Sequence, residues 1–362
     1  MLHRINLPNC LPALEWIVQL QTDLLTALCS NAVDQAQVTL NWVITQLPGL
    51  PPNWVISFCS WAIEGASILE RMQNIAALPV ATKHQLLQHF NNNLQYIDAF
   101  DHAKNPPATR RLEHGMPHNA DKKYRDFLEI FYDPVFYRSK GYPVDTDGNI
   151  NGATRFHKDI FLDRCHKIND DLRVCPLCDG SLDGSQVDHW LPKKHFPELS
   201  CQPHNLIEIC QACNSRSNKG EKSTLTNGDA TPFEDWFHPY LRPANGKFTI
   251  RIELKGVPQL QGGNAHDAIR LSNLDSLINL QSRWAKEYRT QIKRIEGKIR
   301  GCKRRGATFT TNSLKSLIED WRDAVQDQIG LETHAMLEQS VLSLASDENS
   351  HLFAEFFDFA VS

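Results

Sequence analysis

Two closely spaced pairs of cysteines constrain the fold of this chain more than any other feature. Among 10 cysteines in 362 residues, four form two Cys-x-x-Cys pairs, Cys175 with Cys178 and Cys210 with Cys213. This double spacing is typical of tetrahedral thiolate coordination of Zn²⁺. Four cysteine ligands leave no open position for water, so we expect a structural zinc that holds the ends of a short hairpin together. Free buried thiols are the alternative interpretation.

The 31 residues between the two pairs contain side chains suited to a different ion. Asp188 offers a hard oxygen ligand of the kind that Mg²⁺ prefers, and His189 has an ordinary pKa near neutrality. Asn214, directly after the second pair, can supply an amide carbonyl oxygen. These groups predict phosphodiester hydrolysis, in which His189 deprotonates a water molecule and a divalent metal stabilises the developing charge. A surface pair in a purely structural zinc module is the alternative.

The adjacency of Asp188 and His189 makes a local structural prediction. Neighbouring residues of a regular strand face opposite sides, so these two side chains could not both reach one phosphate from within a strand. We therefore expect a strand end or a bulge at this dipeptide.

The order of the motifs resembles that of the HNH endonuclease family. The resemblance covers residues 174–222 and rests on Cys-Pro-x-Cys, Asp188-His189-x-x-Pro-Lys, Phe196-Pro197, Asn205-Leu206-Ile207, Cys210-x-x-Cys213-Asn214 and Lys219-Gly220. It implies a ββα-metal fold. The first strand would start near Val187, the second would lie in NLIEIC, and a helix would follow from about Asn214.

The same resemblance implies roles for individual residues. His189 would be the general base, Asp188 and Asn214 would hold a catalytic Mg²⁺ or Mn²⁺, and Asn205 would brace the loop that bears the base. Lys219 would contact phosphate, although it lies farther from the second cysteine pair than in compact family members.

Charge is distributed unevenly along the chain. The net charge is -4, yet residues 283–305 hold ten basic residues against two glutamates, and residues 315–362 hold ten acids against two basic residues. A local basic strip is what binds phosphates, and the whole-chain sum conceals it. We expect this strip to contact the DNA backbone, a solvated helix face being the alternative. The predicted nucleic-acid contacts are Lys193, Lys219, Lys293, Arg294, Lys298, Arg300, Lys303, Arg304 and Arg305.

Apolar residues at helical spacing, interrupted by proline and glycine, predict a mainly α protein with a small α+β insert. We expect a helical domain over residues 1–103, a hydrophilic linker over 104–123, a nuclease domain over 124–232 and a mostly helical extension over 233–362. The first unit is poor in charge and holds four of the eight tryptophans. These either pack its core or form a docking surface for a partner.

The leading hypothesis is a metal-dependent HNH endonuclease that cuts DNA, with Zn²⁺ for structure and Mg²⁺ or Mn²⁺ for catalysis. No long apolar run and no signal peptide are predicted, so we expect a cytoplasmic protein without a membrane partner. The resemblance implies an effector of bacterial anti-phage defence that acts with a protein partner, an ATPase, as in Septu-like systems. The alternative is a non-catalytic, zinc-containing scaffold that binds nucleic acid or protein.

Overall fold

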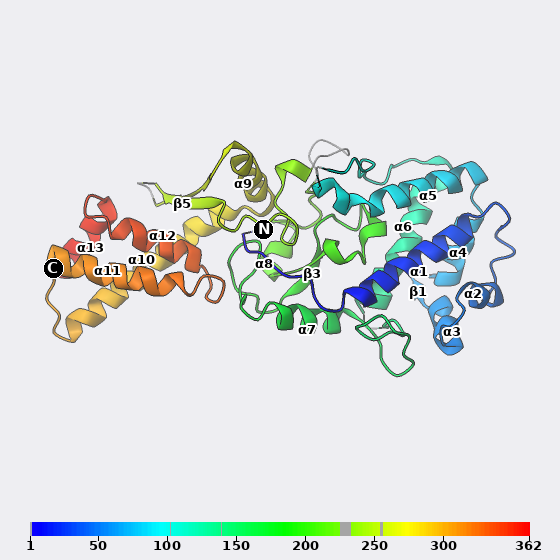
Figure 1. The fold of residues 1–362 in the computed structure, drawn as a ribbon, viewed down its shortest axis with the longest axis horizontal. Helices are drawn as coiled ribbons and strands as arrows, with labels where there is room; N and C mark the ends of the chain where they lie inside the picture. Colours follow the sequence, from blue (N-terminus) through cyan, green and yellow to red (C-terminus); the bar gives the residue numbers. More distant parts are fainter. Residues whose placement is uncertain (1, 102, 139, 225–232, 254–255) are drawn as a thin grey trace.

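The computed structural model describes residues 2–101, 103–138, 140–224, 233–253 and 256–362. Within these residues the chain is mainly α-helical with three pairs of short antiparallel strands, which confirms the predicted mixture of helix and a little sheet. The molecule is elongated, with the N-terminal helices at one end and the C-terminal helices at the other (Figure 1). No helix in the described part of the chain combines the length and apolar character needed to cross a bilayer.

The N-terminal half gathers around one hydrophobic core. Its four tryptophans belong to this core, because Trp54 is buried and the other three pack partly buried against it. Core packing therefore accounts for them. The elements of this half are α1 (Leu11–Cys29), α2 (Leu40–Gln46), α3 (Pro52–Ser60), β1 (Ala62–Ile63), β2 (Ala66–Ser67), α4 (Ile68–Ala76), α5 (Val80–Leu94), α6 (Ala120–Ile130) and α7 (Lys158–Ile168).

The segment predicted to be a linker, residues 104–123, does not separate two cores. Tyr124 of α6 is buried in the same core as α1 and α5. Within the segment itself, the Leu112 amide donates to the carbonyl oxygen of His195 at 2.9 Å. The structure therefore differs from the predicted division at this point, because the hydrophilic composition reflects exposed side chains while the backbone is tied down.

Residues 174–222, called here the four-cysteine module, contain a short hairpin. Strand β3 (Gln186–His189) pairs antiparallel with β4 (Leu206–Ile209). Both strands lie where the sequence predicted them. The helix predicted from about Asn214 is not there, since α8 (Gln211–Asn214) is a single turn that ends at that residue and residues 215–224 are not helical.

The C-terminal part encloses a second core, which also includes Leu2, Ile5 and the four cysteines of the module. The long basic and acidic stretches are helical, as predicted. Helix α10 buries Trp284, Ile295 and Ile299 along one side. The elements of this part are β5 (Phe248–Ile252), β6 (Pro258–Gly262), α9 (Ala265–Ile278), α10 (Leu280–Arg304), α11 (Thr311–Gln326), α12 (Ala335–Ala345) and α13 (His351–Val361).

Gly297 offers a test of the packing of α10. It lies in the helix interior, it is exposed, and a Cβ added to it would meet no atom within 4 Å. Because glycine in a helix costs roughly 0.5–1 kcal/mol relative to alanine, we expect Gly297→Ala to raise the free energy of unfolding by that amount in a urea titration. Gly148 is the contrasting position, with φ +78 and the Pro12 carbonyl oxygen 2.9 Å from an added Cβ. Gly148→Ala should destabilise, and the same sign for both variants would contradict the described backbone.

A four-cysteine centre beside a polar cleft

The four cysteines of the module converge on one point. The Sγ atoms of Cys175 and Cys213 lie 3.9 Å apart, and those of Cys178 and Cys210 lie 3.7 Å apart. All four sulfurs lie within 4.8 Å of one another, and all four residues are buried. Zinc–sulfur bonds of about 2.3 Å in a tetrahedron separate the sulfurs by roughly 3.8 Å. The cluster therefore fits a metal ion such as zinc, as its spacing predicted.

Backbone amides of the second pair help to orient the sulfurs. The Cys210 amide donates to Sγ of Cys175, and the Cys213 amide donates to Sγ of Cys210, both at 3.4 Å. Cys210 is also the residue that caps α8. The single turn of α8 thus places its two cysteines on the metal position while it ends the hairpin.

Helix α10 contacts the cysteine centre through two adjacent residues. The guanidinium of Arg283 donates to Sγ of Cys213 and to Sγ of Cys178, each at 3.2 Å. The indole Nε1 of Trp284 donates to the Cys178 carbonyl oxygen at 3.1 Å. Four thiolates around Zn²⁺ leave a net negative charge, which the guanidinium offsets. Arg283 therefore serves the cysteine centre, whereas the sequence placed it at the start of a phosphate-binding strip.

The N-terminal segment and the start of α12 meet at Asp179, the residue after Cys178. Nε2 of His3 lies 2.6 Å from Asp179 Oδ1 in a buried pair. The Met336 amide donates to Asp179 Oδ2 at 3.1 Å, and the His334 amide donates to the Asp179 carbonyl oxygen at 2.7 Å. The first cysteine pair is thus held by the N-terminal segment and by the start of α12.

A cleft of about 930 Å³ lies beside the hairpin and brings together three of the four predicted catalytic residues, without Asn205. Asp188, His189 and Asn214 all line it. Strand β3 ends at His189, as predicted for this dipeptide, and no bulge is present in its pairing with β4. Asp188 pairs with Ile207 and His189 with Leu206 in this ladder, and both residues line the cleft.

His189 is held in one tautomer. Its Nε2 lies 3.0 Å from the Ser200 carbonyl oxygen, and because a carbonyl only accepts, Nε2 carries the proton. No described residue hydrogen-bonds to Nδ1, and the edge of the Tyr132 ring packs 4.5 Å from the imidazole, measured between centroids. Burial, followed by the charge of Lys193, lowers the pKa of His189 to about 3. The ring is therefore neutral at physiological pH, with a lone pair on Nδ1.

Asp188 is paired with a buried lysine. Nζ of Lys219 lies 2.7 Å from Asp188 Oδ2 and also donates to the His189 carbonyl oxygen. Burial raises the pKa of Asp188, and the charge of Lys219 opposes that rise. Lys219 has no exposed surface, so the prediction that it contacts nucleic acid is contradicted by its burial. It positions the Asp188-His189 dipeptide from inside.

Asn205 fixes the loop that follows His189. Its Oδ1 accepts from the Leu191 amide at 2.6 Å, and its Nδ2 donates to the Leu191 and Leu199 carbonyl oxygens at 3.0 and 2.9 Å. The side chain is fully buried. Because Leu199 directly precedes Ser200, this amide also sets the position of the carbonyl that orients His189.

Asn214 is oriented by a neighbour in β3. Its Nδ2 donates to Oε1 of Gln186 at 2.8 Å. No described residue donates to its Oδ1, which leaves that oxygen available as a ligand. Asp188 and Asn214 together offer a carboxylate and an amide oxygen in one cleft, a donor set that suits Mg²⁺ when water and phosphate complete the shell.

Charged side chains along the cleft are mixed in sign. Lys194 lies 2.5 Å from Glu221, and Lys122 lies 3.7 Å from Asp126, so part of the positive charge is already paired. Carboxylates outnumber lysines and arginines here, and the cleft alone therefore has no excess of positive charge to hold a polyanion. The lining acids are Glu64, Asp121, Asp126, Glu129, Asp133, Asp188 and Glu221, and the lining cations are Lys122, Arg125, Lys193, Lys194 and Arg216.

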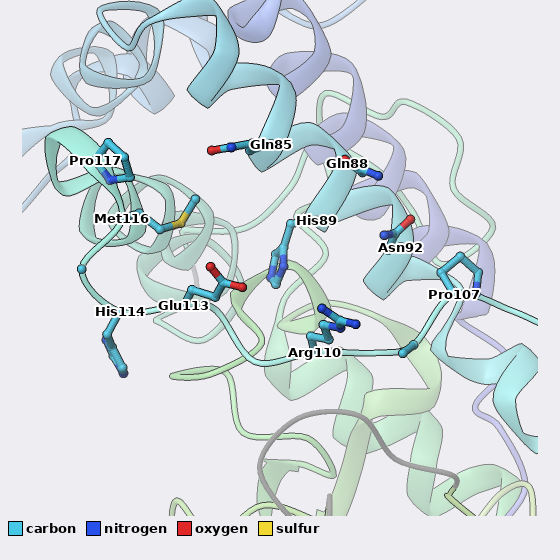
Figure 2. Close-up of a pocket in the computed structure, with 12 residues that line it drawn as sticks. Gln85, Gln88, His89, Asn92, Pro107, Arg110, Glu113, His114, Met116 and Pro117 are labelled. Atoms are coloured by element: carbon cyan, nitrogen blue, oxygen red, sulfur yellow. The ribbon is translucent and has the colours of Figure 1, made fainter.

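A second hollow of about 720 Å³ adjoins this cleft between α5 and residues 107–117. His114 and Gly115 line both hollows, so the two are continuous along this segment. Figure 2 shows side chains of α5 facing those of the segment, with Gln85, Gln88 and His89 on one side and Arg110 and Glu113 on the other. The surface next to the cleft is polar.

The basic strip of residues 283–305 is divided among different surroundings. Lys298 lies 2.9 Å from Glu338, and Nζ of Lys303 donates to the Phe359 carbonyl oxygen at 3.5 Å. Arg294, Lys298 and Arg305 line a groove between α10 and α11. These contacts give part of the strip an intramolecular role.

Three contributors to the cleft were not predicted. Ser200 acts through its backbone carbonyl, which no side-chain motif encodes. Tyr132 comes from a distant segment and has no sequence signal linking it to His189. Gln186 could have been found only from its position two residues before Asp188 in the same strand.

Comparison with known proteins gives two partial similarities. The chain is 36% identical over 67 residues to protein ea31 of Escherichia phage lambda, which covers 18% of this chain and 21% of that protein. It is 30% identical over 108 residues to Septu protein PtuB of Bacillus thuringiensis, which covers 29% of this chain and 38% of that protein. No family model matches the chain, and no solved structure matches it. The similarities thus span well under half of either relative.

Proposed function

We propose that this chain is an HNH-type, metal-dependent endonuclease that hydrolyses phosphodiester bonds in DNA. The observation that carries the proposal is the state of His189. Its neutral ring keeps Nδ1 unpaired among the described residues, in a cleft that Asp188 and Asn214 also line. A general base needs this arrangement of a free lone pair, a fixed tautomer and access to the substrate.

Each residue then has a defined task. His189 accepts a proton from a water molecule at Nδ1, while its Nε2–H remains on the Ser200 carbonyl oxygen. A divalent ion such as Mg²⁺ or Mn²⁺, held by Asp188 and Asn214, would stabilise the charge that develops on the phosphate. Asn205 fixes the loop that carries the carbonyl partner of His189, and Lys219 favours the charged form of Asp188 and aligns its carboxylate.

The partial similarity to Septu protein PtuB supports a biological setting. We propose an effector subunit of bacterial defence against phage or other foreign DNA, acting in the cytoplasm with a protein partner such as an ATPase. Size-exclusion chromatography with the products of neighbouring genes tests this setting. A lone monomer in every combination would remove it.

One observation favours the alternative of a non-catalytic scaffold. The ammonium of Lys219 already neutralises Asp188 Oδ2, as a metal ion would. A carboxylate has a second oxygen, however, and a paired, oriented aspartate can still bind a cation through it. In the endonuclease proposal, Asp188 can therefore pair with Lys219 through one oxygen and hold the metal ion through the other.

The endonuclease proposal predicts divalent-metal dependence. Supercoiled plasmid incubated with the zinc-loaded protein, alone and with its genomic neighbours, should become nicked or linear with Mg²⁺ or Mn²⁺ and stay intact when these ions are omitted. The physical reason is that the cleft supplies too little positive charge by itself to stabilise the developing phosphate charge. Equal cleavage without added divalent ions would contradict the proposed mechanism.

A further inference from the structure

Helix α10 carries a single straight row of basic side chains on its solvent face. Successive members are three, four, seven and four residues apart. These spacings sum to 18 residues, or five turns of about 3.6 residues, so all members lie on the same face of the helix. All its members are exposed. They are Lys286, Arg289, Lys293, Arg300 and Arg304, referred to below as the α10 row.

The α10 row lies opposite the face that α10 buries. Trp284, Gln291, Ile295 and Ile299 face the second core, half a turn away from the row. Gly297 falls within the row, and a Cβ added there would meet nothing within 4 Å. In the described part of the chain, α13 borders this face through Phe359, and the five side chains of the row remain exposed.

The charges of the α10 row are not neutralised internally. None of its members forms an ion pair with a carboxylate in the parts of the chain that the structure describes, unlike Lys298, which pairs with Glu338. Arg300 lies over the ring of Phe359, 5.4 Å from its centroid. Five cations in one line, with Glu296 as the acid beside them, attract a partner with regularly spaced negative charge.

The dimensions and composition of the α10 row identify that partner. The row extends for roughly 27 Å, about eight phosphate steps of one DNA strand. It contains no aromatic side chain on which unpaired bases could stack. It also lacks the aromatic and methionine anchors that are enriched in protein interfaces.

The row is fixed relative to the cysteine centre. It begins one turn after Arg283, whose guanidinium contacts Sγ of Cys213 and Cys178. Figure 1 shows α10 running from the middle of the molecule toward the C-terminal end. A partner bound along α10 would therefore have a set position relative to the module.

We infer that the α10 row binds the phosphate backbone of double-stranded DNA and supplies the affinity for substrate that the cleft lacks. The inference rests on the proposed function and adds where the duplex is held. It also narrows the predicted strip of residues 283–305. Lys286 and Arg289 are added to the residues named as contacts, while Arg283, Lys298 and Lys303 have intramolecular contacts.

The test compares two triple variants with equal charge change. The row variant is Lys286→Gln, Arg289→Gln and Lys293→Gln. The control variant is Arg294→Gln, Lys298→Gln and Arg305→Gln, in which two residues of α10 and its C-cap residue line a groove on another side of the helix. Affinity for a duplex of about 30 base pairs is measured without added divalent ions between about 50 and 200 mM salt. The row variant should lower the slope of log affinity against log salt by about 2.7, with affinity about two orders of magnitude weaker near 0.1 M salt. The control variant should change the slope by less than about 1.

Several outcomes would overturn the inference. These are a parent protein that does not bind duplex, equal slopes for the two variants, or a row variant that binds duplex normally but loses an acidic protein partner. Zinc content and thermal unfolding of both variants verify that they are folded. Failure of the proposed function gives a different result. A His189→Ala protein that cuts as fast as the parent would refute the role of His189 as general base, while the salt dependence of duplex binding would still test the α10 row.

Discussion

His189→Ala is expected to reduce DNA cleavage by about 10²–10⁴-fold while DNA binding is retained. The variant removes the only imidazole that lines the cleft beside Asp188 and Asn214 with an unpaired Nδ1 among the described residues. Without it, no group at that position can take the proton from water. The measurement is the single-turnover rate of plasmid cleavage with saturating Mg²⁺ or Mn²⁺.

Controls separate loss of the base from loss of structure. His195→Ala removes a second histidine from the same loop, which does not line the cleft, and should cut at the parent rate. Because His189→Ala leaves the Ser200 carbonyl without its donor, zinc content and thermal unfolding must be compared as well. Imidazole added to the medium should restore part of the rate to His189→Ala if the loss is chemical. An undiminished rate in His189→Ala would sink the assigned mechanism.

Cys213→Ser is expected to abolish stable zinc binding and to unfold the four-cysteine module. The serine hydroxyl is a poor zinc ligand, and structural zinc contributes roughly 10–16 kcal/mol in small zinc peptides, as much as the whole stability of a typical domain. Cys213 also accepts the Arg283 hydrogen bond, so the contact with α10 is weakened at the same time. Metal analysis of the purified protein and its thermal unfolding curve measure both effects.

Cys201 provides the matched control for this variant. It is buried in the same module but lies outside the group of four converging sulfurs. Cys201→Ala should keep the zinc content of the parent and lose only packing. If Cys213→Ser bound zinc as the parent does, or if Cys201→Ala lost it, the four assigned ligands would be incorrect.

Local sequence patterns predicted the cysteine cluster, the long helices and the end of strand β3, because each depends on contacts between residues close together in the sequence. The two cysteine pairs converge because each Cys-x-x-Cys turn places its own sulfurs together, and the hairpin needs only to bring two turns into contact. The long helices follow from apolar periodicity. The strand end at Asp188-His189 followed from the alternation of side chains along a strand.

Contacts between distant segments escaped prediction. The family resemblance implied that Lys219 contacts phosphate, but in the structure it is buried against Asp188. Arg283 looked like part of a basic strip, but its partners are Cys213 and Cys178, which lie 70 and 105 residues away in the sequence and reach it only through tertiary packing. No residue pattern within a window of a few turns encodes such pairings.

The attachment of Asp179 and Arg283 to other parts of the chain bears on how separable the zinc module is. Asp179 contacts the His3 side chain and the backbone amides of His334 and Met336. Arg283 of α10 donates hydrogen bonds to the cysteine sulfurs. A fragment limited to residues 174–222 would lack all of these and would expose an uncompensated anionic cluster to solvent. The module therefore depends on segments outside residues 174–222 and should not keep its metal when it is excised or grafted alone, and loss of the N-terminal segment, of α10 or of the start of α12 should weaken the metal site.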